Sequence, residues 1–221
     1  MLKYSSSWWW RTLRATFGLG LLLCMSLAGG CTLVKSAAVY AGPKTEKMPA
    51  EFTSMPGKKV LVFVWVPPEI KWDYPYIRLD LAAHVGAYLT ENVKGVTVID
   101  ARRVEEYLAK SRQFETDPVE VGRHFHADMV LHLAVYQFSM RDPGMAHYYR
   151  GRIASSVEVY DLAEKGGSAH RALLHEVNVA YPDEKALGFT NVRPDQVRQA
   201  TYEVFTVEVG KKFHSYERPL D

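Results

Sequence analysis

The side chains best suited to metal chemistry in this sequence are three histidines and one aspartate, His124, His126, Asp128 and His132. If the first part of this stretch is helical, His124 and Asp128 lie four residues apart and share a face, whereas His126 points elsewhere. A zinc site requires three or four converging ligands, and this spacing matches no recognised zinc motif. The spacing favours exposed histidines near a helix end. Metal or small-ligand binding by this cluster is kept as the alternative.

Motifs for catalysis are absent from the sequence. It has no Gly-x-Ser-x-Gly turn, no phosphate-binding glycine loop and no His-Glu-x-x-His pair. Adjacent acids such as Glu105 and Glu106 point to different sides of a helix and are typical of a solvated face. We therefore expect a protein that is not an enzyme and that needs no cofactor and no metal.

A third group of residues is typical of protein interfaces. The loop between two predicted strands contains Arg141, Met145, Tyr148, Tyr149 and Arg150, and Trp72 lies in another loop after a predicted strand. Arginine and aromatic residues are enriched at the energetic centres of interfaces. These six residues are our candidate partner interface. The alternative is that the two tyrosines pack locally and the arginines form surface ion pairs.

The N-terminus predicts export and a lipid anchor. Residues 1–16 include three basic residues and no acid, and an apolar run of eleven residues, 17–27, follows. This run is too short to span a membrane comfortably and has the size of a signal-peptide core. Small residues then lead to Cys31, as in a bacterial lipoprotein box. We expect cleavage before Cys31 and acylation, for example with palmitate, which anchors the protein in a membrane.

Removal of residues 1–30 changes the charge balance. The whole chain has 27 basic and 25 acidic residues, for a net charge of +2. The signal holds three of the basic residues and none of the acidic ones, so residues 31–221 have 24 and 25 and a net charge of −1. A nearly neutral chain does not bind nucleic acid by bulk charge. Residues 31–58, rich in proline, glycine and lysine, are predicted to be the lipidated cysteine and its linker.

Residues 59–216 predict one α/β domain, with residues 217–221 as a tail. A continuous β-branched run indicates a buried strand, whereas apolar residues at spacings of three and four indicate helices packed on a sheet. The order is β-α-β-α-α-β-β-β-α, which predicts a mixed sheet covered by helices. The expected strands are 59–66, 96–99, 129–138, 152–160 and 173–181, and the expected helices begin near residues 75, 100, 117 and 194.

Two stretches carry a family resemblance. Residues 95–108 contain Gly-Val-Thr-Val-Ile-Asp followed by Val-Glu-Glu-Tyr-Leu, and residues 121–131 contain a glycine, then Ala-Asp, then an apolar strand. Both resemble the CsgG-like group, which includes curli-secretion lipoproteins, lipoprotein activators of penicillin-binding proteins (LpoB-like) and the N-terminal domain of TolB-like proteins. The sequence departs from the group at His132-Leu133-Ala134, where a glycine is common.

The resemblance implies a lipid-anchored periplasmic domain that acts through protein–protein contacts in envelope assembly or secretion, with a second copy of the chain among its candidate partners. A curli-type pore requires long hairpins, and the two candidate loops, 139–149 and 161–171, have only eleven residues each. A transmembrane strand alone needs about 9–11 residues, so we expect no pore. Thr32 after the lipid cysteine, in place of the Asp that signals inner-membrane retention, favours the outer membrane.

Overall fold

The computed structural model describes residues 45–110, 117–142, 144, 148–162, 169–183, 187–188 and 193–220. Its strands are β1 (Thr45–Met48), β2 (Lys59–Trp65), β3 (Thr97–Val98), β4 (Met129–Ser139), β5 (Tyr148–Tyr149), β6 (Gly151–Asp161), β7 (His170–Tyr181), β8 (Leu187–Gly188) and β9 (Tyr216–Pro219). Its helices are α3 (Pro68–Asp73), α4 (Ile77–Asn92), α5 (Ala101–Lys110), α6 (Pro118–His124) and α7 (Pro194–Gly210). None of the helices in these described ranges is long and apolar enough to cross a membrane.

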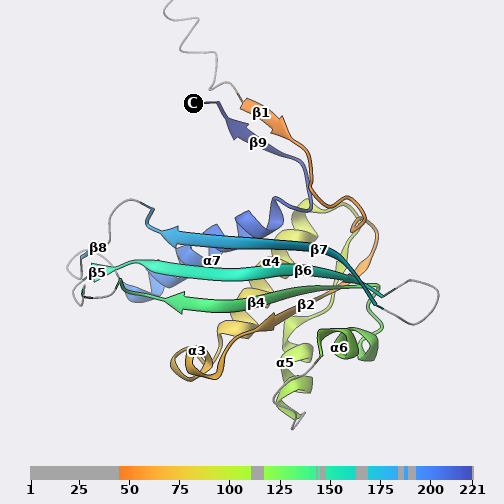
Figure 1. Cartoon of the computed structure of the whole chain (residues 1–221), viewed down its shortest axis with the longest axis horizontal. Coiled ribbons are helices and arrows are strands. Elements are labelled where there is room, and N and C mark those ends of the chain that lie inside the picture. The colour runs from red at the N-terminus through yellow and green to blue at the C-terminus, as the bar shows by residue number, and fades with distance from the viewer. Residues whose placement is uncertain are drawn as a thin grey trace, which may run out of the picture. The chain divides into compact units, whose positions relative to one another are not determined.

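A five-stranded mixed sheet, in the order β3-β2-β4-β6-β7, forms the centre of the domain (Figure 1). Strand β2 runs parallel to both β3 and β4, whereas β4–β6 and β6–β7 are antiparallel. The apolar run in β2 is buried because this strand has a neighbour on each side and helices on both faces. The prediction of an α/β domain with a mixed sheet and the order β-α-β-α-α-β-β-β-α is confirmed.

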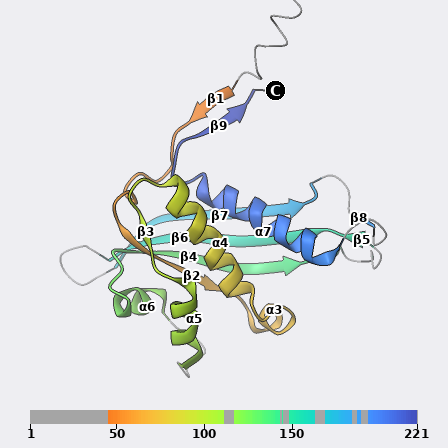
Figure 2. The same ribbon diagram turned by 180° about the vertical axis from the view of Figure 1, so that it is seen from behind.

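Helices α4 and α7 cover one face of the sheet along most of its length (Figure 2). The core between them is built from alternate strand residues, such as Leu131 of β4 and Ile153 of β6, packed against Leu81 and Phe205 of the two helices. All four side chains are fully buried. This layer fixes the first turn of α7 against the ends of the strands.

Helices α5 and α6 cover only part of the opposite face. A smaller apolar cluster joins Leu61 and Phe63 of β2 to Val104 of α5 and Val121 of α6. Farther along the same face no described helix covers β6 and β7 in Figure 1, and large side chains such as Tyr136 are exposed. One end of the sheet is therefore enclosed on both faces and the other end is open on one.

The structure also contains elements that hydrophobic periodicity does not predict. Helix α3 begins at Pro68, directly after Pro67. Proline has no backbone N–H group, and the first helical position tolerates it because an N–H group there has no partner within the helix. Strands β1 and β9 pair with each other, and the hydroxyl of Thr45 donates to Glu217 at 3.2 Å. The stretch 31–58, predicted to be a linker, thus includes β1, and its Met55 is fully buried in the core.

Candidate functional site

The histidine cluster proposed from the sequence is not assembled. The ring of His124 stacks on Tyr107, with 4.1 Å between ring centroids, whereas His126 is exposed in a turn at φ 51°. Asp128, directly before β4, accepts a hydrogen bond from the backbone nitrogen of Lys59 at 2.8 Å, which links it to the start of β2. Within the described ranges, no group of three or more His, Cys, Asp or Glu side chains lies close enough to hold a metal ion.

His132 belongs instead to a polar cluster on the open sheet face. Its Nδ1 lies 3.4 Å from Glu158 Oε2, the hydroxyl of Tyr160 donates to the same oxygen, and Arg171 lies 3.7 Å from the other carboxylate oxygen. Burial lowers the pKa of His132, although hydrogen bonding and charge from Glu158 oppose that shift. Burial, then the bond to Glu158, raises the pKa of Tyr160 to about 12. Glu158 of β6 thus links His132 of β4 to Arg171 of β7, so the cluster is a cross-strand brace.

Some of the predicted interface residues lie at the end of the sheet where β4 ends. A hollow of about 460 Å³ opens there, between α3, the end of β4 and the start of α7. We call it the β4-end hollow. It is lined by Asp73, Tyr74, Phe138, Ser139, Met140, Arg141, Tyr149, Pro194 and Arg198. Two of the six predicted residues, Arg141 and Tyr149, form part of its wall. Trp72 and Tyr148 directly precede other residues of the lining in the chain.

Ion pairs hold the chain segment that carries Arg141. Asp142 Oδ1 accepts a hydrogen bond from Arg152 Nε at 2.6 Å, and its other oxygen lies 3.7 Å from Arg150. The bond from Arg152, with the positive charges of both arginines, holds the pKa of the Asp142 carboxyl below its usual range. The backbone nitrogen of Arg150 also donates to Met140 at 3.0 Å. The end of β4 and the start of β6 are thereby clamped together beside the hollow.

Aromatic contacts order the floor and walls of the hollow. The guanidinium of Arg141 lies 5.2 Å from the ring centroid of Tyr149 and donates to its hydroxyl at 3.3 Å. Tyr74 packs edge-on against Phe138, with 4.6 Å between centroids. Burial and the charge of Asp73 raise the pKa of Tyr74, whereas Arg141 and Arg198 oppose the shift. The positive charges of Arg141, just after β4, and of Arg198, on α7, therefore both favour ionisation of the Tyr74 hydroxyl.

The five candidate interface residues that the structure describes divide into exposed and at least partly buried ones. Trp72 is 87% exposed and Tyr148 is 49% exposed, and Arg141 is also exposed. Tyr149 is buried, and Arg150 is half-buried and donates to the backbone oxygen of Asp183. Tyr149 and Arg150 thus have the local packing and ion-pairing role that was the alternative. Met145 and Cys31 lie outside the described residues.

Sequence reasoning did not find Arg198. It lies on α7, one turn after Pro194, and is half-buried at the wall shared by the β4-end hollow and an adjoining hollow of about 90 Å³. Arg198 makes no ion pair or hydrogen bond with any residue in the described ranges, and its positive charge acts on Tyr74 and Tyr202. Its neighbour Val197 is in the core. Periodicity alone indicates only that Arg198 lies beside the buried stripe of a helix.

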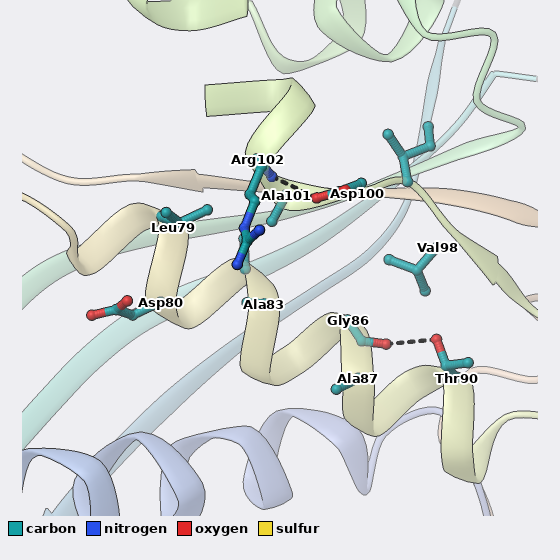
Figure 3. A pocket seen from close by; sticks show the side chains of 12 residues that line it. Leu79, Asp80, Ala83, Gly86, Ala87, Thr90, Val98, Asp100, Ala101 and Arg102 are labelled. Carbon is teal, nitrogen blue, oxygen red and sulfur yellow. Dashed lines mark hydrogen bonds between the residues drawn. The ribbon is translucent and has the colours of Figure 1, made fainter. Parts of the chain in front are cut away.

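A separate hollow of about 380 Å³ lies between α4, β3 and the start of α5 (Figure 3). Small residues of α4, such as Ala83 and Gly86, form its floor, and Arg102 extends across it toward α4. Asp100, directly before α5, accepts a hydrogen bond from the backbone nitrogen of Arg102 at 2.8 Å. This hollow contains none of the predicted site residues and brings no aromatic side chain to its lining.

No protein-family model matches the chain, and the search of curated proteins found no match. Among solved structures, a PelC dodecamer from Paraburkholderia phytofirmans is 11% identical, over 77% of this chain and 97% of that one, at a TM-score of 0.42. Lipoprotein GNA1162 from Neisseria meningitidis is 16% identical, over 66% of this chain and 94% of that one, at a TM-score of 0.42. The C-terminal domain of LpoB from Salmonella enterica is 10% identical, over 57% of this chain and 84% of that one, at a TM-score of 0.29. The neighbours thus include bacterial lipoproteins, and TM-scores below 0.5 establish no shared function.

Proposed function

We propose that this protein is a lipid-anchored periplasmic protein of the bacterial envelope, and that it acts through protein–protein contacts in envelope assembly or secretion. In this proposal it is neither an enzyme nor a pore. The observation that carries the proposal is a set of exposed aromatic side chains in the segments that form the β4-end hollow and the hollow next to it, where Trp72, Tyr76 and Tyr148 expose 87%, 72% and 49% of their area. Large exposed aromatic side chains beside ordered arginines are the composition of interface centres.

The scaffold behind this surface supports a binding role. The clamp between Asp142 and Arg152, and the packing of Tyr74 on Phe138, hold the walls of the hollow in place. A partner that binds a pre-ordered surface loses less conformational entropy than one that must order it. The resemblance of the sequence to the CsgG-like group is consistent with this role.

The anchor in this proposal is Cys31, with the outer membrane as its location. Substitution Cys31→Ser removes the acylated thiol and should move the protein from the membrane fraction to the soluble periplasmic fraction. Two or more acyl chains are needed for stable anchoring, at about 0.8 kcal/mol for each buried CH₂. Unchanged membrane association of Cys31→Ser would contradict the anchor while leaving the interface proposal intact.

The interface is tested by site-specific photo-crosslinking of the full chain in bacterial cells. A photoreactive phenylalanine analogue replaces Trp72 or Tyr148 in two separate variants, and Arg102, beside the other hollow, in a control variant. We expect the first two variants to yield the same crosslinked protein, and the control to yield none of it. A crosslinked product with twice the mass of the chain identifies a second copy as the partner. Equal crosslinking at all three positions, or none at positions 72 and 148, would contradict the proposed interface.

A further inference from the structure

We infer that the β4-end hollow binds a carboxylate of an acidic, extended segment of the partner protein, with the guanidinium of Arg198 as its principal contact. This inference rests on the proposed function and adds to it the chemical class of the partner. Three features support it: the charges that line the hollow, the shape of the two adjoining hollows, and the exposed aromatic residues next in the chain to the lining.

The charges of the lining favour an anion. In the larger hollow Arg141 and Arg198 contribute two guanidinium groups, and Asp73 contributes one carboxylate. The smaller hollow adds a second carboxylate, Asp80, so the excess of positive charge is confined to the larger hollow. Arg141 is stacked on Tyr149 and bonded to its hydroxyl, which holds the positive charge at a fixed place in the wall. Arg198 is half-buried and forms no ion pair with a described residue. A guanidinium presents several donors in a fixed fork that matches the two oxygens of a carboxylate.

The shape of the site favours a chain segment over a single small ion. The hollow of about 460 Å³ adjoins the one of about 90 Å³, and the two share Asp73, Tyr74 and Arg198 in their walls. The smaller hollow continues past Tyr76 and the first turn of α4. Together they form a path along which a side chain can reach Arg198 while its neighbours in the chain contact other lining residues.

The lining and the exposed aromatic residues next to it in the chain favour a protein over a free phosphate group. Asp73, exposed in the lining, repels any anion, and the repulsion is larger for a phosphate group with a charge of about −1.5 to −2 than for a carboxylate with one charge. Trp72 and Tyr148, each next in the chain to a lining residue, expose aromatic area that a protein can contact. Aromatic side chains around desolvated charges are typical of protein interfaces.

The test measures binding of two labelled peptides to the purified domain, residues 45–221, and to the acylated full chain in detergent. One peptide is a hexapeptide of alternating Glu and Gly with an N-terminal fluorophore, and the other has Gln in place of each Glu. We expect the Glu peptide alone to bind, with an affinity that falls as salt rises. Arg198→Gln should weaken that binding about tenfold, the size of a lost charge-assisted hydrogen bond. Arg198→Lys keeps the positive charge but lacks the paired N–H donors of the guanidinium, so it should lose less affinity for the Glu peptide than Arg198→Gln does.

The matched control is Arg102→Gln, which removes the same charge at the hollow between α4 and α5. It should bind the Glu peptide like the unaltered protein, and thermal unfolding should show that both Gln variants remain folded. Equal loss in the two Gln variants, or equal binding of the Glu and Gln peptides, would overturn the inference. Tighter binding of inorganic phosphate, or of phosphatidylglycerol vesicles, with the same dependence on Arg198 would also overturn it, because the ligand would then be a phosphate group.

The crosslinking experiment separates this inference from the proposed function. If Arg198→Gln loses the Glu peptide and also loses the crosslink from position 72, both proposals are supported. If the peptide does not bind but the crosslink from position 72 persists in Arg198→Gln, the partner interface stands and the carboxylate site is wrong. If no crosslink forms in the unaltered chain, the proposed function fails whatever the peptide does.

Discussion

Substitution of Gly151 by alanine tests how closely α7 approaches the sheet beside the candidate site. Gly151 is the first residue of β6 and is buried against α7. A Cβ added there would lie 1.9 Å from Oγ1 of Thr201, 2.8 Å from its Cβ and 2.9 Å from its Cγ2. Thr201 is itself fully buried, and its hydroxyl donates to the backbone oxygen of Val197 at 2.6 Å. Because Gly151 and Thr201 are both buried, neither can move away without displacing its neighbours.

The expected cost follows from these distances. A carbon at 1.9 Å from oxygen is far inside the contact distance, so α7 must shift or the threonine must rotate and lose its hydrogen bond. Overpacking of this kind costs about 1–3 kcal/mol. For a domain of this size, a urea dependence of about 2 kcal/mol per molar converts ~2 kcal/mol into a fall of roughly 1 M in the unfolding midpoint. The thermal midpoint should fall by about 4–8 °C.

The assay is urea unfolding of Gly151→Ala, Thr201→Ala and the double variant. Thr201→Ala removes the two atoms Oγ1 and Cγ2, so the alanine at position 151 should cost less in the double variant than alone. We expect a coupling free energy of about 1 kcal/mol or more in the direction of rescue. If Gly151→Ala is as stable as the unaltered protein, or if the two changes are additive, α7 does not approach β6 as described.

Two further predictions concern the brace and the core. Burial lowers the pKa of His132, so the unfolded chain binds more protons than the native one below about pH 6.5, and the free energy of unfolding should fall as the pH drops through that value. Urea unfolding at pH 7.5 and pH 5 should show this loss in the unaltered protein and a smaller loss in His132→Gln; an unchanged loss would contradict the assignment. Phe205→Ala should cost about 3–5 kcal/mol because the side chain is fully buried, whereas Val207→Ala, 37% exposed on the same helix, should stay within about 0.5 kcal/mol. Similar urea midpoints for these two variants would refute the assigned packing of α7.

Elements with strong hydrophobic periodicity could be predicted from the sequence. The apolar run of β2 and the stripe of α4 each point to one kind of structure, because burial on both faces or on one side imposes a distinct spacing. Helix α3 could not be found in this way. It has six residues and no buried side chain, and its initial prolines are equally typical of a loop. Strands β1 and β9 depend on a pairing between residues about 170 positions apart, which local patterns do not contain.

The histidine cluster shows how a dense sequence motif can separate in space. His124 ends α6 and stacks on an aromatic ring of α5, whereas His132 lies within β4 and pairs across to β6. A turn containing His126 and Asp128 separates the two elements. Spacing on a helix therefore predicts nothing about residues that lie beyond its end, and the four ligands never share a face.

The β4-end hollow illustrates the opposite case, in which residues distant in sequence meet. Loop composition suggests Arg141 and Trp72, because arginine and aromatic residues are enriched at the energetic centres of interfaces. Arg198 lies 57 positions after Arg141 and belongs to a helix whose pattern indicates only a buried stripe. It reaches the hollow because the close contact of Gly151 with Thr201 places the first turn of α7 beside the end of β4. The position of the proposed carboxylate contact thus depends on a glycine that carries no chemistry, and a shift of α7 in Gly151→Ala should weaken peptide binding as well as stability.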